Sequence, residues 1–264
     1  MRLPLIIIFT YQCNLKCSYC PVLKKNNSFN KALAFRTIDL YFNYLGKSTG
    51  KIKISGGEPL VEKELLKEII EYIRGKSASI EIEVTTNGIL LENTISNWFR
   101  KNKINLLISL DGGPEVQLLN RKGTTFKNYQ KIIQLIRNNA SYPTVNIVVN
   151  SNTVNIFFQN FLFLYNLGIR KFNFLPVAYL PWTQNELNLL QNQFDLIAQF
   201  VIKHPDIYIK NVDIDNDFFF FNTGIVVDTN GDIFFTNAIT LESLQKNKKN
   251  LKVANVKKKK NFNF

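Results

Sequence analysis

The chain has 264 residues, a length that suits one large domain or two small ones. Hydrophobic residues make up 45% and charged residues 20%, which excludes a disordered or collagen-like chain. The net charge is +13, yet residues 246–264 hold eight Lys and no acid, which leaves 25 basic and 20 acidic groups in residues 1–245. The basic excess therefore lies mostly in the tail, as a solvated end of the chain or a contact for an acidic partner.

Apolar, β-branched runs alternate with longer segments of helical period, which is typical of βα units around a parallel sheet. Strands are predicted over residues 3–10, 51–55, 80–86, 106–110, 145–149 and 171–175. A helix is predicted after each strand, over residues 31–44, 62–74, 91–101, 126–138, 156–167 and 186–203. The pattern predicts an α/β fold, and the chain is long enough for one α/β barrel.

The pattern changes after the sixth helix. Residues 225–228 and 232–236 flank the turn Asn230-Gly231 and predict a β-hairpin. The apolar run 218–221 before it predicts a strand or a buried plug in preference to a ligand site. We therefore expect a small appendage beyond residue 205 and a flexible basic tail over residues 257–264.

The cysteines and the first apolar run bear on localisation. The chain has three Cys, an odd number, and no cleavable signal peptide, which argues against a secreted disulfide-bonded protein. Residues 3–9 are too few to cross a membrane and lead directly into the cysteines, so we interpret them as a buried strand. We expect a cytoplasmic protein without a membrane partner, and a nucleic-acid partner is not indicated.

The unusual residues follow the predicted strands. In a βα barrel, reactive groups gather in the loops at the carboxyl ends of the strands, because the strands themselves fill the core. The clusters after the first four strands are Cys13, Cys17 and Cys20; then Gly56-Gly57-Glu58-Pro59; then Asn87-Gly88; then Ser109 with Asp111-Gly112-Gly113. We expect all four clusters at one rim.

The three cysteines supply every thiol of the chain within eight residues, spaced C-x3-C-x2-C. Thiolates bind zinc or iron–sulfur clusters. A structural zinc ion normally takes four ligands, and the single histidine, His204, lies far along the chain, where we interpret it as a helix-end residue. Three ligands without a fourth suit a four-iron cluster with one iron open to an outside ligand. Inert cysteines or a three-ligand zinc site would explain neither the spacing nor the rim position.

These motifs carry a family resemblance. Residues 13–21 read CNLKCSYCP and resemble the cluster loop of radical S-adenosylmethionine (SAM) enzymes. Residues 55–59 read SGGEP and resemble the GGEP segment of that family, and residues 86–88, TNG, resemble its third-strand signature. The resemblance implies a partial (β/α)6 barrel of the TIM type and one [4Fe-4S] cluster on Cys13, Cys17 and Cys20, with SAM chelated by the fourth iron.

The same resemblance implies roles in SAM binding. Gly56 and Gly57 would let the backbone approach the ligand, and Glu58 or adjacent carbonyls would accept from the SAM ammonium. Ser109 resembles a ribose-contacting residue, and Arg121 resembles one that binds the SAM carboxylate.

Three further candidates complete the expected SAM site. Tyr19 is expected near the adenine, and Asn87 and Asn150 are either SAM contacts or caps of strand ends. The cluster would give one electron to SAM, releasing methionine and a radical that removes hydrogen from the substrate. An external donor such as flavodoxin or ferredoxin would supply that electron.

A narrower resemblance is to the SPASM/twitch branch, which is rich in peptide- and protein-modifying enzymes. It rests on ISLDG at residues 108–112, FNFLPV at 172–177, GDIF at 231–234 and ANV at 254–256. Where that branch holds cysteines for auxiliary clusters, this chain has Asn222 and Asn237. We therefore expect a single cluster, in a radical SAM barrel over residues 1–205 followed by a degenerate SPASM/twitch-like extension over residues 206–256.

The leading hypothesis is a radical SAM enzyme that acts on a peptide or protein. One alternative is the same chemistry on a small molecule or nucleotide, and another is a glycyl-radical-enzyme activase, which shares C-x3-C-x2-C and GGEP but not the Ser-Leu-Asp-Gly stretch. A third is a non-catalytic, cluster-bearing partner subunit. The intact cysteines, Gly-Gly-Glu and Arg121 speak against the third alternative. No residue is assigned as a substrate base.

Overall fold

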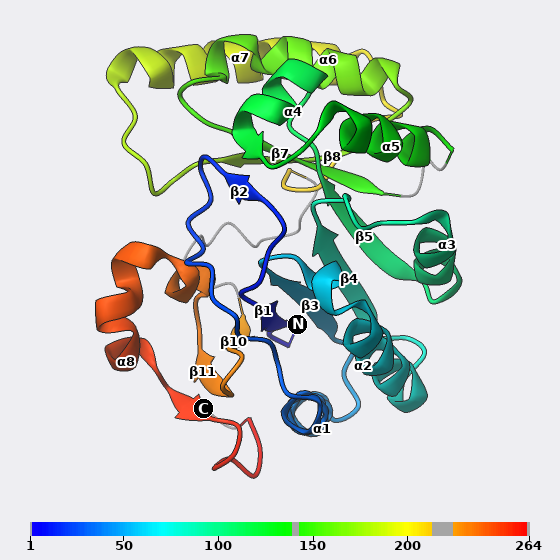
Figure 1. The fold of residues 1–264 in the computed structure, drawn as a ribbon, viewed down its shortest axis with the longest axis vertical. Coiled ribbons are helices and arrows are strands. Elements are labelled where there is room, and N and C mark those ends of the chain that lie inside the picture. Colours follow the sequence, from blue (N-terminus) through cyan, green and yellow to red (C-terminus); the bar gives the residue numbers. More distant parts are fainter. Residues whose placement is uncertain (1, 139–142, 213–223, 263–264) are drawn as a thin grey trace.

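The computed structural model describes residues 2–138, 143–212 and 224–262 (Figure 1). Its centre is a parallel sheet, and six of the strands coincide with the six predicted ones. They are β1 (Leu5–Thr10), β3 (Lys51–Gly56), β4 (Glu81–Thr86), β5 (Ile104–Ser109), β7 (Thr144–Val149) and β8 (Lys171–Pro176). The predicted α/β fold is confirmed.

The sheet is open, with the strand order β12-β11-β10-β1-β3-β4-β5-β7-β8-β9. Its edges are β12 (Ala254–Asn255) and β9 (Tyr208–Ile209). Every pairing from β10 to β9 is parallel, so the carboxyl ends of these strands lie along one side. Within the described ranges no pairing joins the two edges, and the sheet is the expected partial barrel.

Helices cover the outer side of the sheet (Figure 1). The predicted six are α1 (Lys31–Leu45), α2 (Lys63–Lys76), α3 (Asn93–Lys101), α5 (Phe126–Arg137), α6 (Phe157–Asn166) and α7 (Gln184–Ile202). The short helix α4 (Pro114–Asn120) and the ribbon of β2 (Lys16–Cys17) with β6 (Arg121–Lys122) were not predicted. None of the helices in the described parts of the chain combines the length and apolarity that a membrane crossing needs.

The main core lies between the sheet and the helices, and the first strand shows how the sequence builds it. Side chains alternate between the two faces of a strand, so Leu5, Ile7 and Phe9 all point into the main core, where none has any exposed surface. Ile6 and Ile8 point the other way, into a second apolar cluster shared with the C-terminal hairpin. Both faces of β1 are therefore buried.

The predicted hairpin is β10 (Ile225–Val227) with β11 (Asp232–Phe234), joined at Asn230-Gly231. Gly231 has φ +84°, which glycine adopts without strain. β10 pairs in parallel with β1, so the hairpin continues the main sheet. The 3-10 turns η3 (Asn237–Thr240) and η4 (Glu242–Asn247) and the helix α8 (Lys248–Leu251) follow. The predicted strand or plug at residues 218–221 and Asn222 lie outside the described residues.

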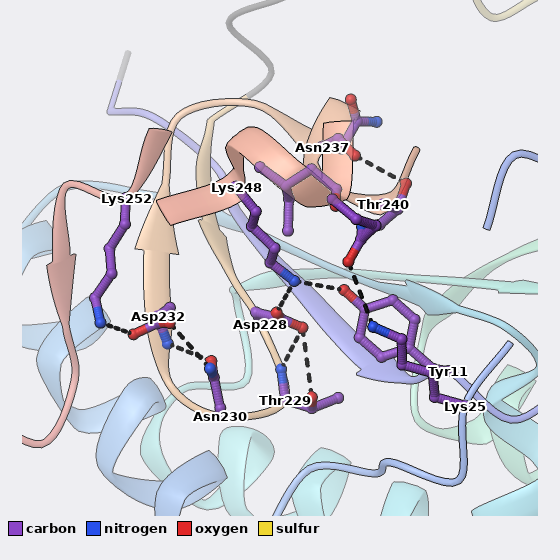
Figure 2. Close-up of polar contacts among 12 residues, drawn as sticks. Tyr11, Lys25, Asp228, Thr229, Asn230, Asp232, Asn237, Thr240, Lys248 and Lys252 are labelled. Carbon is purple, nitrogen blue, oxygen red and sulfur yellow. Dashed lines mark hydrogen bonds and ion pairs between the residues drawn. The ribbon is translucent and has the colours of Figure 1, made fainter. Parts of the chain in front are cut away.

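A buried polar contact ties this extension to the chain just ahead of the cysteine loop (Figure 2). The ammonium of Lys248 contacts the Asp228 carboxylate and lies 3.2 Å from the Tyr11 hydroxyl. Tyr11 and Asp228 are both buried, and burial together with the nearby carboxylate raises the pKa of Tyr11. The extension is thus anchored beside the end of β1.

The tail differs from the free arm that the sequence predicts. The Arg36 guanidinium of α1 donates at 2.9 Å to the carbonyls of both Val256 and Lys259. Phe262 has no exposed surface and belongs to the main core. An aromatic side chain and a guanidinium fork therefore hold residues 256–262 against α1, in spite of their four consecutive lysines.

Candidate active site

A cavity of about 640 Å³ opens at the carboxyl ends of the strands. Residues from all four predicted rim clusters line it, so those clusters do meet at one rim. The predicted cofactor residues in its wall are Cys13, Cys17, Tyr19, Cys20, Gly56, Gly57, Asn87, Ser109 and Arg121. Two other predicted residues, Glu58 and Asn150, are buried outside this wall.

The unpredicted ribbon holds the cysteine loop in place. β2 pairs with β6 so that Cys17 lies opposite Arg121. The amide of Ser18 donates to the carbonyl of Asn120 at 2.8 Å, which extends the pairing by one residue. Leu15 anchors the start of the loop, with 1% of its surface exposed. The ribbon therefore brings a cysteine and an arginine from distant parts of the sequence to the same wall.

All three thiols are free and partly buried. Burial raises the pKa of Cys13 above its ordinary value and raises that of Cys17 to about 11. Across the described ranges, no group of three or more His, Cys, Asp or Glu side chains converges to hold a metal ion. The donors are three soft thiols along one cavity wall, an arrangement that suits the separate irons of a cluster better than a single zinc ion.

The Gly56-Gly57 pair allows close packing of backbone against backbone within the protein. A Cβ atom on Gly56 would lie 2.3 Å from the carbonyl oxygen of Thr10, and one on Gly57 would lie 2.0 Å from that of Gln12. The amide of Gly57 donates to the Thr10 carbonyl at 2.7 Å. Both glycines line the cavity, but the atoms that a Cβ would meet are protein backbone. The missing Cβ atoms let the end of β3 pack against the chain that enters the cysteine loop, and the approach of this backbone to SAM stays a prediction.

The Glu58 carboxylate makes its hydrogen bonds inside the protein, and a contact of this side chain with the SAM ammonium stays a prediction. It has no exposed surface, and its carboxylate accepts from the Leu60 amide at 3.0 Å, the Thr86 hydroxyl at 2.7 Å and the Asn87 amide at 2.6 Å. Burial raises its pKa, and these hydrogen bonds oppose part of that rise. Glu58 thus joins the end of β3 to the end of β4, which leaves the adjacent backbone carbonyls as candidate acceptors for the ammonium.

Asp111 connects several walls of the cavity. No role was predicted for it. Its fully buried carboxylate accepts from the Arg121 Nη2 at 2.8 Å, the Tyr19 hydroxyl at 2.7 Å and the Val148 amide at 3.1 Å. The Arg121 guanidinium carbon also lies 5.5 Å from the centre of the Tyr19 ring. Burial alone would lower the pKa of Arg121, but the Asp111 charge outweighs it and raises that pKa. The Ser-Leu-Asp-Gly stretch after the fourth strand was the signal for this residue.

The two predicted asparagines differ. The Asn87 amide nitrogen donates to Asn14 Oδ1 at 2.7 Å and lies 3.9 Å from the Cys13 sulfur, so Asn87 belongs to the wall beside the cysteine loop. The Asn150 amide donates to Asn120 Oδ1 at 3.1 Å, and its oxygen accepts from the amide two residues further on at 3.0 Å. Asn150 therefore makes the contacts of a strand-end cap, the second of its two predicted roles.

Another part of the cavity wall comes from the end of β8, the loop after it and the C-terminal extension. The end of β8 and the loop contribute the apolar residues Leu175–Ala178 and also Tyr179, whose hydroxyl donates to the Tyr19 carbonyl. The extension contributes Asn237 and Thr240, both visible in Figure 2, together with Ala238 and Leu241. The sequence predicts the extension but not its place in this wall.

The comparison with known families agrees with this geometry. The model of the radical SAM superfamily matches residues 7–156, which is more than half of the chain and includes the cysteine loop and Arg121. The chain belongs to the radical SAM superfamily. The protein is therefore a radical SAM enzyme, and the family implies SAM and a [4Fe-4S] cluster as its cofactors.

Several curated proteins resemble this radical SAM enzyme. It is 28% identical to an uncharacterised protein of Methanocaldococcus jannaschii over 275 residues, covering 97% of this chain and 93% of that protein. It is 34% identical to a probable GTP 3′,8-cyclase of the same organism over 146 residues, 54% of this chain and 47% of the cyclase. It is 28% identical to a molybdenum cofactor biosynthesis protein of Caenorhabditis elegans over 226 residues, 80% of this chain and 36% of that protein. The chain thus spans less than half the length of the latter two relatives.

Solved structures share the fold. The enzyme anSMEcpe with bound AdoMet superposes with a TM-score of 0.82 at 19% identity, covering 98% of this chain and 79% of that one. SuiB of Streptococcus suis, bound to the precursor peptide SuiA, gives a TM-score of 0.70 at 15% identity, covering 98% and 63%. The superfamily is confirmed, whereas the SPASM/twitch branch stays a prediction because curated relatives include GTP 3′,8-cyclases.

Proposed function

We propose that this radical SAM enzyme holds one [4Fe-4S] cluster on Cys13, Cys17 and Cys20 and abstracts a hydrogen atom from a peptide or protein. Three thiols line one cavity, and the described lining of that cavity holds no His, Asp or Glu beside them. When bound, the cluster and SAM supply the one-electron cleavage that creates the hydrogen-abstracting radical. An external donor of the flavodoxin or ferredoxin class supplies the electron.

The residues of the chain hold SAM in position. Arg121 is oriented by Asp111, and its Nε is buried without a hydrogen-bond partner among the described residues, so the guanidinium binds the SAM carboxylate. Ser109 contacts the ribose and Tyr19 lies near the adenine, since both line the same cavity. Asn87, 3.9 Å from the sulfur of a proposed cluster ligand, orients that thiolate.

The charge of the cavity wall is the observation that supports a peptide or protein substrate. Arg121 and Lys24 are the cationic side chains in the described part of the wall, and Arg121 already pairs with Asp111. A nucleoside triphosphate carries several negative charges, which proteins usually neutralise with several basic side chains or with Mg²⁺. The wall formed by the end of β8 and the loop after it is instead apolar, with Leu175 and Val177 among its members. An uncharged peptide side chain fits this wall better than a triphosphate does.

A nucleotide substrate is the second candidate. The similarity to probable GTP 3′,8-cyclases, 34% identity over 146 residues in one case, favours it. GTP is therefore the reference substrate against which a peptide is tested.

Deuterium transfer distinguishes the two candidates. The reconstituted enzyme, SAM and dithionite are incubated either with GTP deuterated at C3′ or with the peptide and protein fraction of source cells grown in deuterated medium. Mass spectrometry then measures deuterium in the 5′-deoxyadenosine that forms. We expect label from the peptide fraction and none from GTP, with no 5′-deoxyadenosine at all from the Cys17→Ala control. Label from GTP would contradict a peptide substrate.

A further inference from the structure

Two lysines lie side by side on the ribbon that holds the cysteine loop. Lys16 of β2 is the cross-strand neighbour of Lys122 of β6, and both are exposed. Side chains alternate across a strand, so this pair points away from Cys17 and Arg121, which line the cavity. Like charges directly opposite each other destabilise an antiparallel pair. No ion pair within the described residues compensates either lysine, so the outer side of the ribbon carries unneutralised positive charge.

A shallow hollow beside the cysteine loop is also lined by positively charged side chains. It has a volume of about 390 Å³, and its lining includes Cys13, Lys24 and Lys25 but no carboxylate of the described chain. The ammonium of Lys24 contacts the carbonyl of Leu15, the residue before Lys16. Lys25 is exposed, and its ammonium donates to Gln245 of the extension at 3.4 Å.

The carboxylate nearest to this hollow in the hydrogen-bond network, that of Glu62, is engaged elsewhere. Glu62 accepts from the Gln12 side chain at 3.2 Å and from the Ser28 hydroxyl at 3.1 Å. It lies at the start of α2 and pairs with none of the lysines of the loop or the ribbon in the described structure. The outer side of the cysteine loop therefore attracts negative charge from outside the chain.

We propose that this lysine face, defined by Lys16 and Lys122, is the docking surface for an acidic one-electron carrier protein. The proposal rests on the proposed function, because a cluster held by the three cysteines must receive its electron from outside. Cys17 and the lysine pair lie on opposite faces of the ribbon, so a docked carrier is separated from a cluster held at Cys17 by a single layer of chain. The carrier is oxidised by one electron and the cluster is reduced by one, with no other reactant.

The test reverses the charge of the ribbon pair. The variant Lys16→Glu/Lys122→Glu is compared with the wild type for binding of an acidic flavodoxin and for 5′-deoxyadenosine formation with that flavodoxin, reduced by its reductase, as electron donor. At low ionic strength we expect flavodoxin affinity and the flavodoxin-driven rate to fall at least about tenfold, and both losses to shrink as salt is added. The rate with dithionite should stay within about twofold, because a small reductant needs no docking surface.

Two controls complete the experiment. Lys47→Glu/Lys103→Glu makes the same change in net charge on exposed loops that lead into β3 and β5, at the opposite end of the sheet, and should leave flavodoxin binding unchanged. Lys16→Gln/Lys122→Gln removes the charge without reversing it and should give a smaller loss in the same direction. Equal flavodoxin affinity in the ribbon and loop variants would overturn the docking surface. A wild-type enzyme that forms no 5′-deoxyadenosine with dithionite would instead overturn the proposed function.

Discussion

Asp111→Asn tests the buried ion pair between Asp111 and Arg121 in the active site. Asparagine keeps the size of the side chain and removes its charge, which leaves the Arg121 guanidinium buried without its counter-ion. The two side chains are 0% and 6% exposed, so solvent screens this ion pair very little. Breaking a buried pair by removing one partner costs about 3–5 kcal/mol. We expect Asp111→Asn to lower the free energy of unfolding by about that amount and to loosen the contact with Tyr19.

The assay is urea unfolding of the protein under anaerobic conditions, followed by circular dichroism. Asp206→Asn is the matched control, since Asp206 pairs with Arg170 at 2.6 Å, but the arginine and aspartate side chains are 34% and 53% exposed. An exposed pair of this kind contributes no more than about 1 kcal/mol. The reasoning fails if Asp111→Asn loses no more stability than Asp206→Asn.

Three further variants test the framework of the site. Gly57→Ala should reduce iron uptake on reconstitution, measured by iron analysis, because the new Cβ would lie 2.0 Å from the backbone that enters the cysteine loop. Gly75→Ala should leave iron uptake unchanged, because no neighbouring atom lies within 4 Å of the new Cβ. Glu58→Gln should lower Tm, measured by calorimetry, more than it weakens SAM binding, because the carboxylate braces two strands. Burial pushes the pKa of Glu83 upward, but ion pairs with Lys210 and a second lysine outweigh it and leave this pKa low. The stability advantage of wild type over Glu83→Gln should therefore be full above about pH 5 and should be lost as pH falls through the lowered pKa of Glu83, in urea unfolding at several pH values.

Elements with a long periodic pattern could be predicted from the sequence, and short ones could not. The main helices each bury a regular stripe of apolar residues and the main strands are apolar, β-branched runs, both of which the sequence displays directly. α4 has seven residues and the strands of the ribbon have two each, too few to show a period. The ribbon depends on pairing between distant segments, such as the contact of Ser18 with Asn120, 102 positions apart. The strand propensity of either segment alone does not indicate which distant segment it pairs with.

The site could be located from its motifs, but the direction in which each side chain points could not. The cysteines and Arg121 line the cavity as the motifs indicated. Glu58 sits in an equally clear motif, yet its oxygens face Leu60, Thr86 and Asn87, because buried backbone amides and a hydroxyl there need an acceptor. The placement of the tail depends on a side-chain direction as well. Four consecutive lysines indicated a free arm, whereas the side chain of Phe262 is buried and holds the tail against the protein.

The most direct test of the account is SAM cleavage by the reconstituted protein with dithionite as the reductant and no substrate. We predict 5′-deoxyadenosine from wild type that holds about four irons per chain, the content of one [4Fe-4S] cluster, and none from Cys17→Ala. Wild type that holds its cluster but leaves SAM intact, or a Cys17→Ala variant that cleaves SAM at the wild-type rate, would contradict the assignment of this cavity as a radical SAM active site.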